Sequence, residues 1–303
     1  MTGTRRPLAG GALVLLAAAL WATLGIFGKV LEARGLAAVE LASARACIAA
    51  LGAGIYLLAR DRRALRIRAL ELPFFILYGV VGFALFQLAF FETLERTTVA
   101  IAVALLYTAP AFVVLLSWLT RQEPVARGRL LPLGLVLAGV FLVTGAAWGV
   151  ATGAASLPGP AVALGLASGL TYALYTVLGK RATRHHAPAT VLFRVFAVAA
   201  VALALFAPPW RIAADHTDSL ALLLLLGLLP TLAAYALYAR ALELLPASTA
   251  ALLASVEPVI AALLGWAILG EGLGWDRALG VACIVVATAS LAQRPVRIQN
   301  AGH

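Results

Sequence analysis

The sequence predicts an all-α integral membrane protein whose ten transmembrane helices form two inverted five-helix repeats. Three observations lead to this fold class: a very apolar composition, a repeat of the chain upon itself, and an uneven distribution of positive charge. Of the 303 residues, 63% are hydrophobic and 12% are charged, and the mean hydropathy is +0.99. Soluble domains carry roughly 25% charged residues. The chain is therefore expected to lie in a lipid bilayer.

Ten apolar runs are long enough to cross a bilayer. About 20 apolar residues span the hydrocarbon layer, and backbone polar groups inside it must be bonded within a helix or a closed barrel. The two-residue alternation that is typical of barrel strands is absent, so each run is expected to be a helix. The first run is longer than the apolar core of a signal peptide and is interpreted as a span. The predicted spans are residues 8–29, 38–59, 72–92, 98–119, 130–148, 159–179, 188–208, 219–239, 247–269 and 276–292.

The second half of the chain repeats the first at a spacing of 148 residues, the distance from Pro110 to Pro258. Apolar matches are common by chance in such a chain, so the evidence consists of matched Pro, Trp, Glu and Arg residues in one ungapped window. These pairs are Pro110 and Pro258, Trp118 and Trp266, Glu123 and Glu271, and Arg129 and Arg277. The repeat predicts a first five-helix unit at 8–148, an extracytoplasmic linker at 149–158 and a second unit at 159–292, together forming one membrane domain. Glu123 and Glu271 are expected to cap or flank the last helix of each unit and to have no role in transport.

Positive charge predicts the orientation of the spans. Most of the 23 Lys and Arg residues lie in segments that are cytoplasmic if the N-terminus is cytoplasmic. The opposite side holds only Lys29, Arg34, Arg96, Arg211 and Arg277. This bias follows the positive-inside rule and predicts an inner-membrane protein with both termini in the cytoplasm. Because each unit has an odd number of spans, the second unit enters the membrane in the opposite direction.

The net charge of +10 is explained by the same orientation, because the excess positive charge faces anionic lipid headgroups. No nucleic-acid partner is expected. The expected partners are a small-molecule substrate and membrane lipid, and the sequence leaves monomer and dimer open.

With these features the chain resembles the EamA-type branch of the drug/metabolite transporter superfamily. The resemblance rests on the two five-helix copies, on the TAP and VEP tripeptides at 108–110 and 256–258, and on the Trp-to-Glu segment that follows each. It extends over residues 8–292. It implies a transporter of amino acids, other metabolites or toxic compounds, or of nucleotide sugars or triose phosphates. Length and layout are similar to those of bacterial amino-acid exporters, including an aromatic amino-acid exporter.

Inverted repeats also predict a mechanism, since they typically bind substrate near the midplane and alternate access by rocking one unit against the other. The expected function is secondary export of amino acids or similar small metabolites across the inner membrane, around a central cavity. A multidrug, nucleotide-sugar or other metabolite transporter of the same fold is the main alternative. A duplicated bundle without transport, and a membrane enzyme or lipid-handling protein, are more remote alternatives.

Helix faces that are shared by the two units predict the lining of this cavity. Residues at i, i+4 and i+7 lie on one stripe of a helix, and the third and eighth spans carry matching stripes of aromatic and polar residues. The first and sixth spans add Trp and Tyr residues inside the membrane, where anchoring at the interface is the alternative role. The predicted lining residues are Trp21, Phe83, Gln87, Phe90, Tyr172, Tyr175, Thr231, Tyr235 and Tyr238. An amphipathic aromatic lining suits a substrate with an apolar body and polar groups.

Glu257 is the most specific candidate for substrate binding. A carboxylate inside a span is energetically expensive and usually faces a cavity. Its counterpart in the first unit is Ala109, so the predicted site is asymmetric. We expect Glu257 to bind a substrate ammonium group or to exchange a proton; the alternative is a protonated residue that ties helices together. Pro110 and Pro258 each remove a backbone hydrogen bond and are predicted hinges.

Arg45 and Arg194 occupy matching places in the second and seventh spans. Each begins about two turns inside its span, so snorkelling to the interface or helix pairing is the favoured interpretation. Contact with a substrate carboxylate is the alternative.

Catalysis, metal binding and cofactor binding are not expected. Cys47 and Cys283 lie in spans without metal-ligand spacing. His185 and His186 are adjacent, and neighbouring helix residues do not face the same way.

Overall fold

The computed structural model describes residues 5–97, 99–124, 127–153, 158–269 and 274–292. Within these ranges all regular structure is helical and no strand occurs. The α-helices are α1 (Arg5–Ala22), α2 (Leu24–Glu32), α3 (Ala38–Arg60), α4 (Leu72–Ile76), α5 (Phe86–Arg96), α6 (Val99–Leu106), α7 (Ala109–Leu119), α8 (Leu130–Val143), α9 (Ala146–Ala151), α10 (Gly159–Ala182), α11 (Pro188–Ala204), α12 (Pro209–Asp215), α13 (Leu220–Gly227), α14 (Ala234–Leu244), α15 (Ala247–Ala254), α16 (Glu257–Leu269) and α17 (Trp275–Ala292). Short 3₁₀ turns are η1 (Arg62–Leu65), η2 (Ala69–Glu71), η4 (Arg127–Arg129) and η5 (Thr217–Ser219), and π-helical segments are η3 (Leu77–Leu85) and η6 (Leu228–Ala233).

The structure is that of a multi-pass membrane protein. In the described part of the chain seven helices are long and apolar enough to cross a membrane, or eight if the bent pair α11 and α12, at 69°, forms one span. The seven are Pro7–Glu32, Ala38–Arg60, Ala69–Arg96, Ile101–Leu119, Gly159–Ala182, Thr217–Leu244 and Ala247–Leu264. The two remaining predicted spans fall on α8, which is apolar but shorter, and on α17. The count of ten spans and their inverted arrangement remain predictions.

Both predicted hinges lie at breaks in long apolar helices. The first break separates α6 from α7, and Pro110 is the second residue of α7. The other separates α15 from α16, and Pro258 is the second residue of α16. A proline is tolerated in the first turn of a helix because its missing N–H has no partner there. The two breaks are separated by the same 148 residues as the sequence repeat, from Ala109 to Glu257.

The third helix of each half contains a π-helical segment at a matching position. The segments are η3 in the first half and η6 in the second. In η6 the Thr231 hydroxyl donates a hydrogen bond of 2.8 Å to the Leu226 carbonyl, five residues earlier. Segments of this kind are often found at functional sites.

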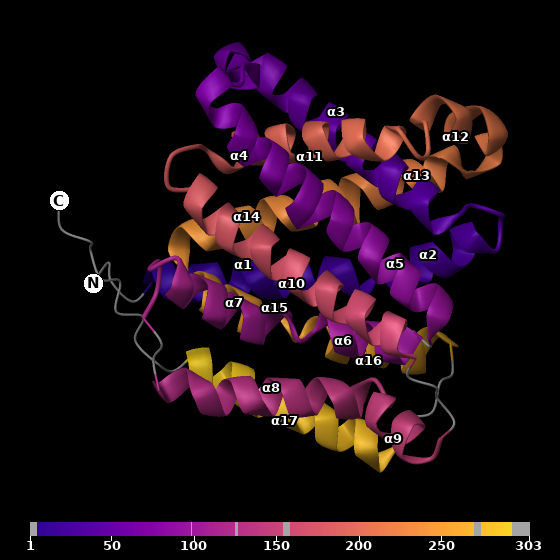
Figure 1. The fold of residues 1–303 in the computed structure, drawn as a ribbon, viewed down its shortest axis with the longest axis vertical. Coiled ribbons are helices and arrows are strands. Elements are labelled where there is room, and N and C mark those ends of the chain that lie inside the picture. Colours follow the sequence, from indigo (N-terminus) through magenta and orange to yellow (C-terminus); the bar gives the residue numbers. More distant parts are fainter. Residues whose placement is uncertain (1–4, 98, 125–126, 154–157, 270–273, 293–303) are drawn as a thin grey trace.

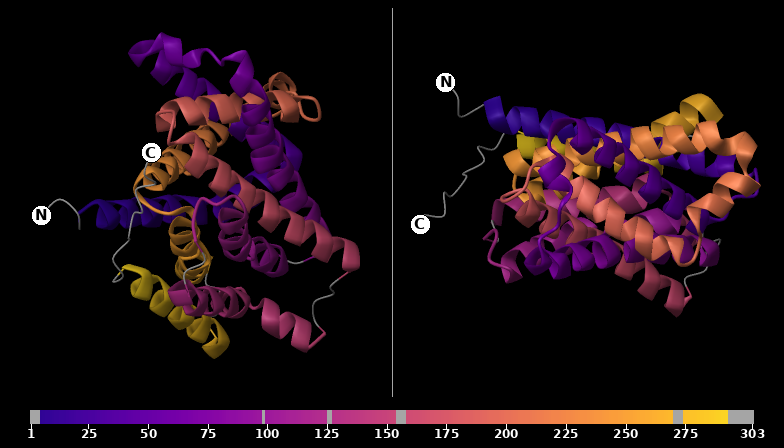
Figure 2. Two further views of the ribbon diagram at one scale, coloured as in Figure 1. Left: turned by 60° about the vertical axis from the view of Figure 1, so that its left-hand side comes forward. Right: turned by 90° about the horizontal axis from the view of Figure 1, so that it is seen from above.

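Many of the helices pack in pairs. Helix α3 packs on α11, α1 on α14 and α8 on α17, while α10 contacts α5, η3 and α7. Figures 1 and 2 show α8 and α17 side by side along one edge of the molecule, with α3 and α11 on the opposite edge. Lipid is as apolar as the side chains, so such helices associate through close packing and hydrogen bonds. At Gly79 a Cβ would lie 2.8 Å from the Val195 carbonyl oxygen, so only glycine permits this approach of η3 to α11.

Candidate functional site

A cavity of about 270 Å³ is lined by residues from both halves of the chain. Its walls come from α1, α2, α3, α5 and α6 of the first half and from α10, α13, α14 and α16 of the second. The predicted site residues that line it are Trp21, Arg45, Gln87, Phe90, Tyr172, Tyr235, Glu257 and Pro258. The cavity therefore combines an aromatic wall with one cationic and one acidic side chain in its interior. Its lining also includes Gly25 and Glu32, which are exposed residues of α2.

Four of the predicted lining residues lie behind the wall instead of in it. Phe83 is fully buried, and its ring lies 5.0 Å from that of Phe196 and 5.6 Å from that of Tyr235. Tyr175 packs on Tyr235 at 5.2 Å. Tyr238 packs on Trp21 at 5.2 Å and shares a hydrogen bond of 3.1 Å with the Thr176 hydroxyl. Tyr238 and Tyr175 thus support the rings that line the cavity.

The fourth of these residues, Thr231, holds Arg45. Arg45 is 5% exposed, and its Nε donates a hydrogen bond of 3.0 Å to the Thr231 hydroxyl oxygen. Arg45 lies in α3 and Thr231 in η6, so this bond joins the two halves of the chain. Arg45 is thus a buried cation that lines the cavity.

Arg194 lies away from the cavity and is held by its own partners. Its Nη1 pairs with Glu71 at 2.9 Å, and its Nη2 donates to the Arg66 carbonyl at 2.7 Å. The guanidinium also lies over the Phe75 ring, 5.0 Å from its centre. The sequence allows three interpretations of Arg194: snorkelling, helix pairing and contact with a substrate carboxylate. Its bonds to Glu71 and Arg66 fit helix pairing. The predicted contact of Arg194 with a substrate carboxylate does not fit this position.

Glu257 is bonded to Tyr107, a residue that the sequence did not indicate. Glu257 begins α16, where the N-terminal end of the helix dipole favours a negative charge. The Tyr107 hydroxyl donates a hydrogen bond of 2.5 Å to Glu257 Oε2, and both residues line the cavity. Tyr107 lies in the break between α6 and α7, so the bond connects the two helix breaks. The available signal was its position directly before the TAP tripeptide.

The other lining residues that sequence reasoning missed are mostly apolar. They gave no signal because such residues occur in every span. They are Ala22, Leu24, Leu41, Phe86, Phe91, Leu94, Val103, Leu106, Leu226 and Ala261. Of the described His, Cys, Asp and Glu residues, no three lie close enough together to hold a metal ion.

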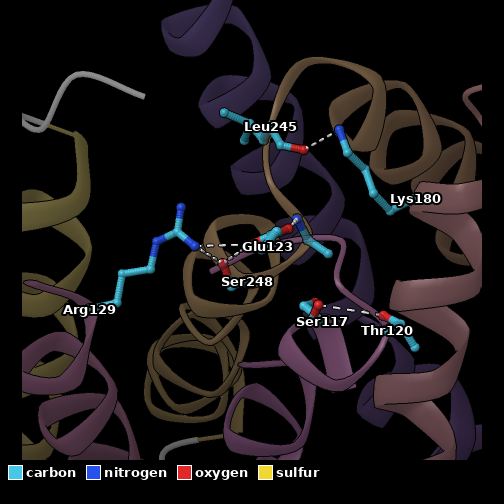
Figure 3. Close-up of polar contacts among 8 residues, drawn as sticks. Ser117, Thr120, Glu123, Arg129, Lys180, Leu245 and Ser248 are labelled. Atoms are coloured by element: carbon cyan, nitrogen blue, oxygen red, sulfur yellow. Dashed lines mark hydrogen bonds and ion pairs between the residues drawn. The ribbon is translucent and has the colours of Figure 1, made fainter. Parts of the chain in front are cut away.

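A polar cluster outside the cavity lining joins the two halves of the chain (Figure 3). Glu123 accepts hydrogen bonds from the Ala247 backbone N–H and the Ser248 hydroxyl, and it pairs with Arg129 at 2.9 Å. We call Glu123, Arg129, Ala247 and Ser248 the latch. Glu123 flanks α8, the last helix of its unit, through Arg129, the residue directly before that helix. Its carboxylate in addition satisfies the N-terminus of α15 in the other half, a contact that the sequence did not predict. Glu271 lies outside the described residues.

Lys180 adds a second connection next to the latch. Its ammonium group donates to the Leu242 and Leu245 carbonyls, at 2.5 and 2.8 Å. These carbonyls end α14, where a cation complements the helix dipole. Lys180 lies two turns beyond the cavity residue Tyr172 on α10, about 12 Å along the helix axis.

Comparison with known proteins agrees with this architecture. Residues 8–145 and 159–292 match the model of the EamA-like transporter family. An uncharacterized transporter of Bacillus subtilis, YwfM, is 28% identical over 294 residues, which cover 96% of both chains. The threonine/homoserine exporter RhtA of Salmonella typhimurium is 33% identical over 199 residues, 66% of this chain and 64% of RhtA.

Solved structures include one crystal structure with a similar fold. It superposes with a TM-score of 0.74 at 20% sequence identity, covering 93% of this chain and 95% of the other. Because the family match extends over both halves of the chain, the assignment does not depend on a single motif. The chain belongs to the EamA-like transporter family.

Proposed function

We propose that this protein is a secondary transporter that exports amino acids or similar small metabolites across the inner membrane. The observation that carries the proposal is an interior cavity in which the Glu257 carboxylate faces an aromatic wall. A carboxylate beside aromatic rings suits an ammonium group, because both attract cations. The similarity to a named threonine/homoserine exporter supports the same substrate class.

The dimensions of the cavity support a small substrate over a nucleotide sugar. Ligand pockets usually measure ~300–1,000 Å³, and this cavity, at about 270 Å³, lies just below that range. Arg45 is the single basic residue among the described residues that line it. A diphosphate group is usually bound by several basic side chains. A multidrug transporter of the same fold remains the second candidate, supported by the large apolar share of the lining.

Alternating access is supported by the positions of the cavity and the latch. In the predicted orientation the cavity extends toward extracytoplasmic segments, at Glu32 and Leu94, whereas the latch joins cytoplasmic ones. This arrangement corresponds to an outward-facing state. Exposure of the cavity to the cytoplasm then requires the latch to open and the helices to rearrange, for which the breaks before Pro110 and Pro258 provide hinges.

A transport assay on the purified protein in liposomes tests the proposed function. We expect counterflow of radiolabelled neutral or aromatic amino acids in loaded vesicles and none in protein-free vesicles. An imposed pH gradient separates proton exchange, which accelerates transport, from facilitated diffusion, which does not respond. Absence of uptake across an amino-acid panel, with uptake of cationic drugs or nucleotide sugars, would contradict the amino-acid assignment.

Removal of the latch carboxylate by Glu123→Ala is expected to favour the state that is open to the cytoplasm. The substitution leaves Arg129 and the start of α15 without their shared acceptor. Hydrogen bonds to a charged group contribute about 1.5–3 kcal/mol each, so the equilibrium between the two states is expected to shift at least tenfold. The shift is measured by the labelling of a cysteine introduced by Thr176→Cys, in a protein whose own cysteines are removed by Cys47→Ser and Cys283→Ser. Thr176 is a buried residue between Tyr172 and Lys180 on α10.

A membrane-impermeant maleimide is expected to label this cysteine about tenfold faster from the cytoplasmic side in the Glu123→Ala protein. The matched control is Glu92→Gln, which removes the charge of an exposed ion pair with Arg96. Exposed pairs contribute little, so this control is expected to label at the wild-type rate. Equal labelling of the Glu123→Ala and control proteins would show that the latch does not hold the cavity closed.

A further inference from the structure

Arg45 and Arg194 are repeat counterparts at a spacing of 149 residues, because the spacing of the repeat drifts slightly toward the N-terminus. Their guanidinium groups are nevertheless bound in different ways. Arg194 is fixed by the carboxylate of Glu71 and the carbonyl of Arg66. Arg45 is equally buried, at 5% exposure, but among the described residues its only hydrogen bond joins Nε to Thr231. No described residue accepts a hydrogen bond from its two Nη groups.

Two differences between the halves account for this contrast. At the spacing of 148 residues, Glu71 corresponds to Ser219, so the second half lacks the carboxylate that would neutralise Arg45. At the same spacing, Thr231 corresponds to Phe83, which has no acceptor for a guanidinium. Arg194, in the second turn of α11, is therefore held by Glu71. Arg45 is held by Thr231 beside the cavity.

Arg45 and Glu257 line the same cavity. In the described part of the chain no ion pair within 4.0 Å joins them. A buried charge without a direct partner is unfavourable. The planar guanidinium is suited to binding a carboxylate through two parallel hydrogen bonds.

We propose that Arg45 forms a carboxylate subsite in the cavity and that Thr231 positions it. This inference rests on the proposed function, in which Glu257 receives the substrate ammonium group. With the two charges provided by different helices, α3 and α16, the substrate must carry an anionic and a cationic group at once. The transporter then discriminates an amino acid from the amine that lacks its carboxylate.

Competition assays with matched compounds test the carboxylate subsite. In liposomes, L-phenylalanine is compared with 2-phenylethylamine, and L-threonine with 1-amino-2-propanol, as inhibitors of amino-acid counterflow. The wild-type protein is expected to prefer each amino acid over its amine at least tenfold. Loss of a hydrogen bond to a charged group lowers the binding affinity by that factor or more. In Arg45→Gln this preference is expected to fall to within about twofold, and Arg45→Lys is expected to retain part of it.

A positioning role of Thr231 has its own signature. Thr231→Val removes the acceptor for Arg45 Nε and is expected to weaken inhibition by the amino acids while leaving that by the amines unchanged. The control is Arg34→Gln, a basic residue bonded to the Asp218 carbonyl outside the cavity, which is expected to keep the full preference. A general structural defect in Thr231→Val would weaken both compound classes alike.

Binding without transport provides an independent measurement. The carboxylate 3-phenylpropanoate, which lacks the ammonium group, is expected to raise the unfolding temperature of the detergent-purified wild type and not that of Arg45→Gln. The proposed carboxylate subsite is wrong if amines and amino acids inhibit the wild-type protein equally. It is also wrong if Arg45→Gln keeps the preference for amino acids and the rise in unfolding temperature with 3-phenylpropanoate. If the wild type moves neither class in liposomes but shows the Arg45-dependent response, the proposed transport function fails and the subsite stands.

Discussion

Replacement of Glu257 by Gln is expected to reduce amino-acid transport by tenfold to a hundredfold while leaving the protein folded. Glutamine has nearly the same shape and can still accept a hydrogen bond from Tyr107. It lacks the charge, and a hydrogen bond between charged groups contributes about 1.5–3 kcal/mol, which corresponds to about that factor in affinity. Counterflow of radiolabelled L-phenylalanine measures the loss, and an unchanged unfolding temperature establishes that the fold is intact.

Two further variants determine whether the effect belongs to the position of Glu257. Tyr107→Phe removes only the hydroxyl that orients the carboxylate, so a smaller reduction in transport is expected. Glu32→Gln neutralises the other acidic residue of the cavity lining, which is exposed and therefore screened by water. That variant is expected to transport within twofold of wild type. Full activity of Glu257→Gln would remove the assigned role of Glu257.

The pH gradient distinguishes the two roles that remain open for Glu257. If the carboxylate exchanges protons, Glu257→Gln is expected to abolish the acceleration by an imposed gradient while leaving slow counterflow. If it binds only the ammonium group, both protein forms respond to the gradient in the same way.

Local features of the fold were predictable from the sequence because their causes are local. A proline cannot continue the hydrogen-bond ladder of a helix, and the structure has helix breaks directly before Pro110 and Pro258. The isolated carboxylate of Glu257 likewise indicated a cavity, because its burial in an apolar setting is unfavourable.

The predicted helix stripe was less accurate, for a reason that the sequence does not reveal. Gln87 and Phe90 line the cavity, whereas Phe83 packs against Phe196 behind it. Phe83 lies in the π-helical segment η3, whose wider turns displace it from the stripe of an ideal α-helix. Nothing in the local residue pattern marked this change of helical geometry.

Contacts between distant segments were the other part that the sequence did not reveal. Tyr107 meets Glu257, and Glu123 meets Ser248, across more than a hundred residues. The repeat treats Arg45 and Arg194 as equivalent. Their different roles depend on neighbours that the fold brings to them, Thr231 in one case and Glu71 in the other.

The second large effect is expected on stability, from a substitution at the contact between α8 and α17. Gly280→Ala is expected to destabilise the protein by about 1–3 kcal/mol, the usual effect of overfilling a packed interior. A Cβ at Gly280 would lie 2.7 Å from the Gly139 carbonyl oxygen and 2.9 Å from the Val143 Cα, and nearer still to the Val143 nitrogen. These are backbone atoms, so the helices themselves must separate. The measurement is the unfolding temperature in detergent.

Gly134→Ala is the matched control, because it makes the same chemical change on α8 where no atom lies within 4 Å of the added Cβ. Alanine is favoured over glycine inside a helix by about 0.5–1 kcal/mol, so this variant is expected to be as stable as wild type or slightly more so. A Gly280→Ala protein with the same unfolding temperature as the Gly134→Ala control would contradict the close approach of α8 and α17.

The effect of Gly280→Ala on transport is expected to be small. Neither α8 nor α17 contributes to the described cavity lining, so Gly280→Ala is expected to lower stability without changing the KM of the protein that remains folded. Glu257→Gln is expected to impair transport without lowering stability. The two variants therefore separate the scaffold of this transporter from its binding site.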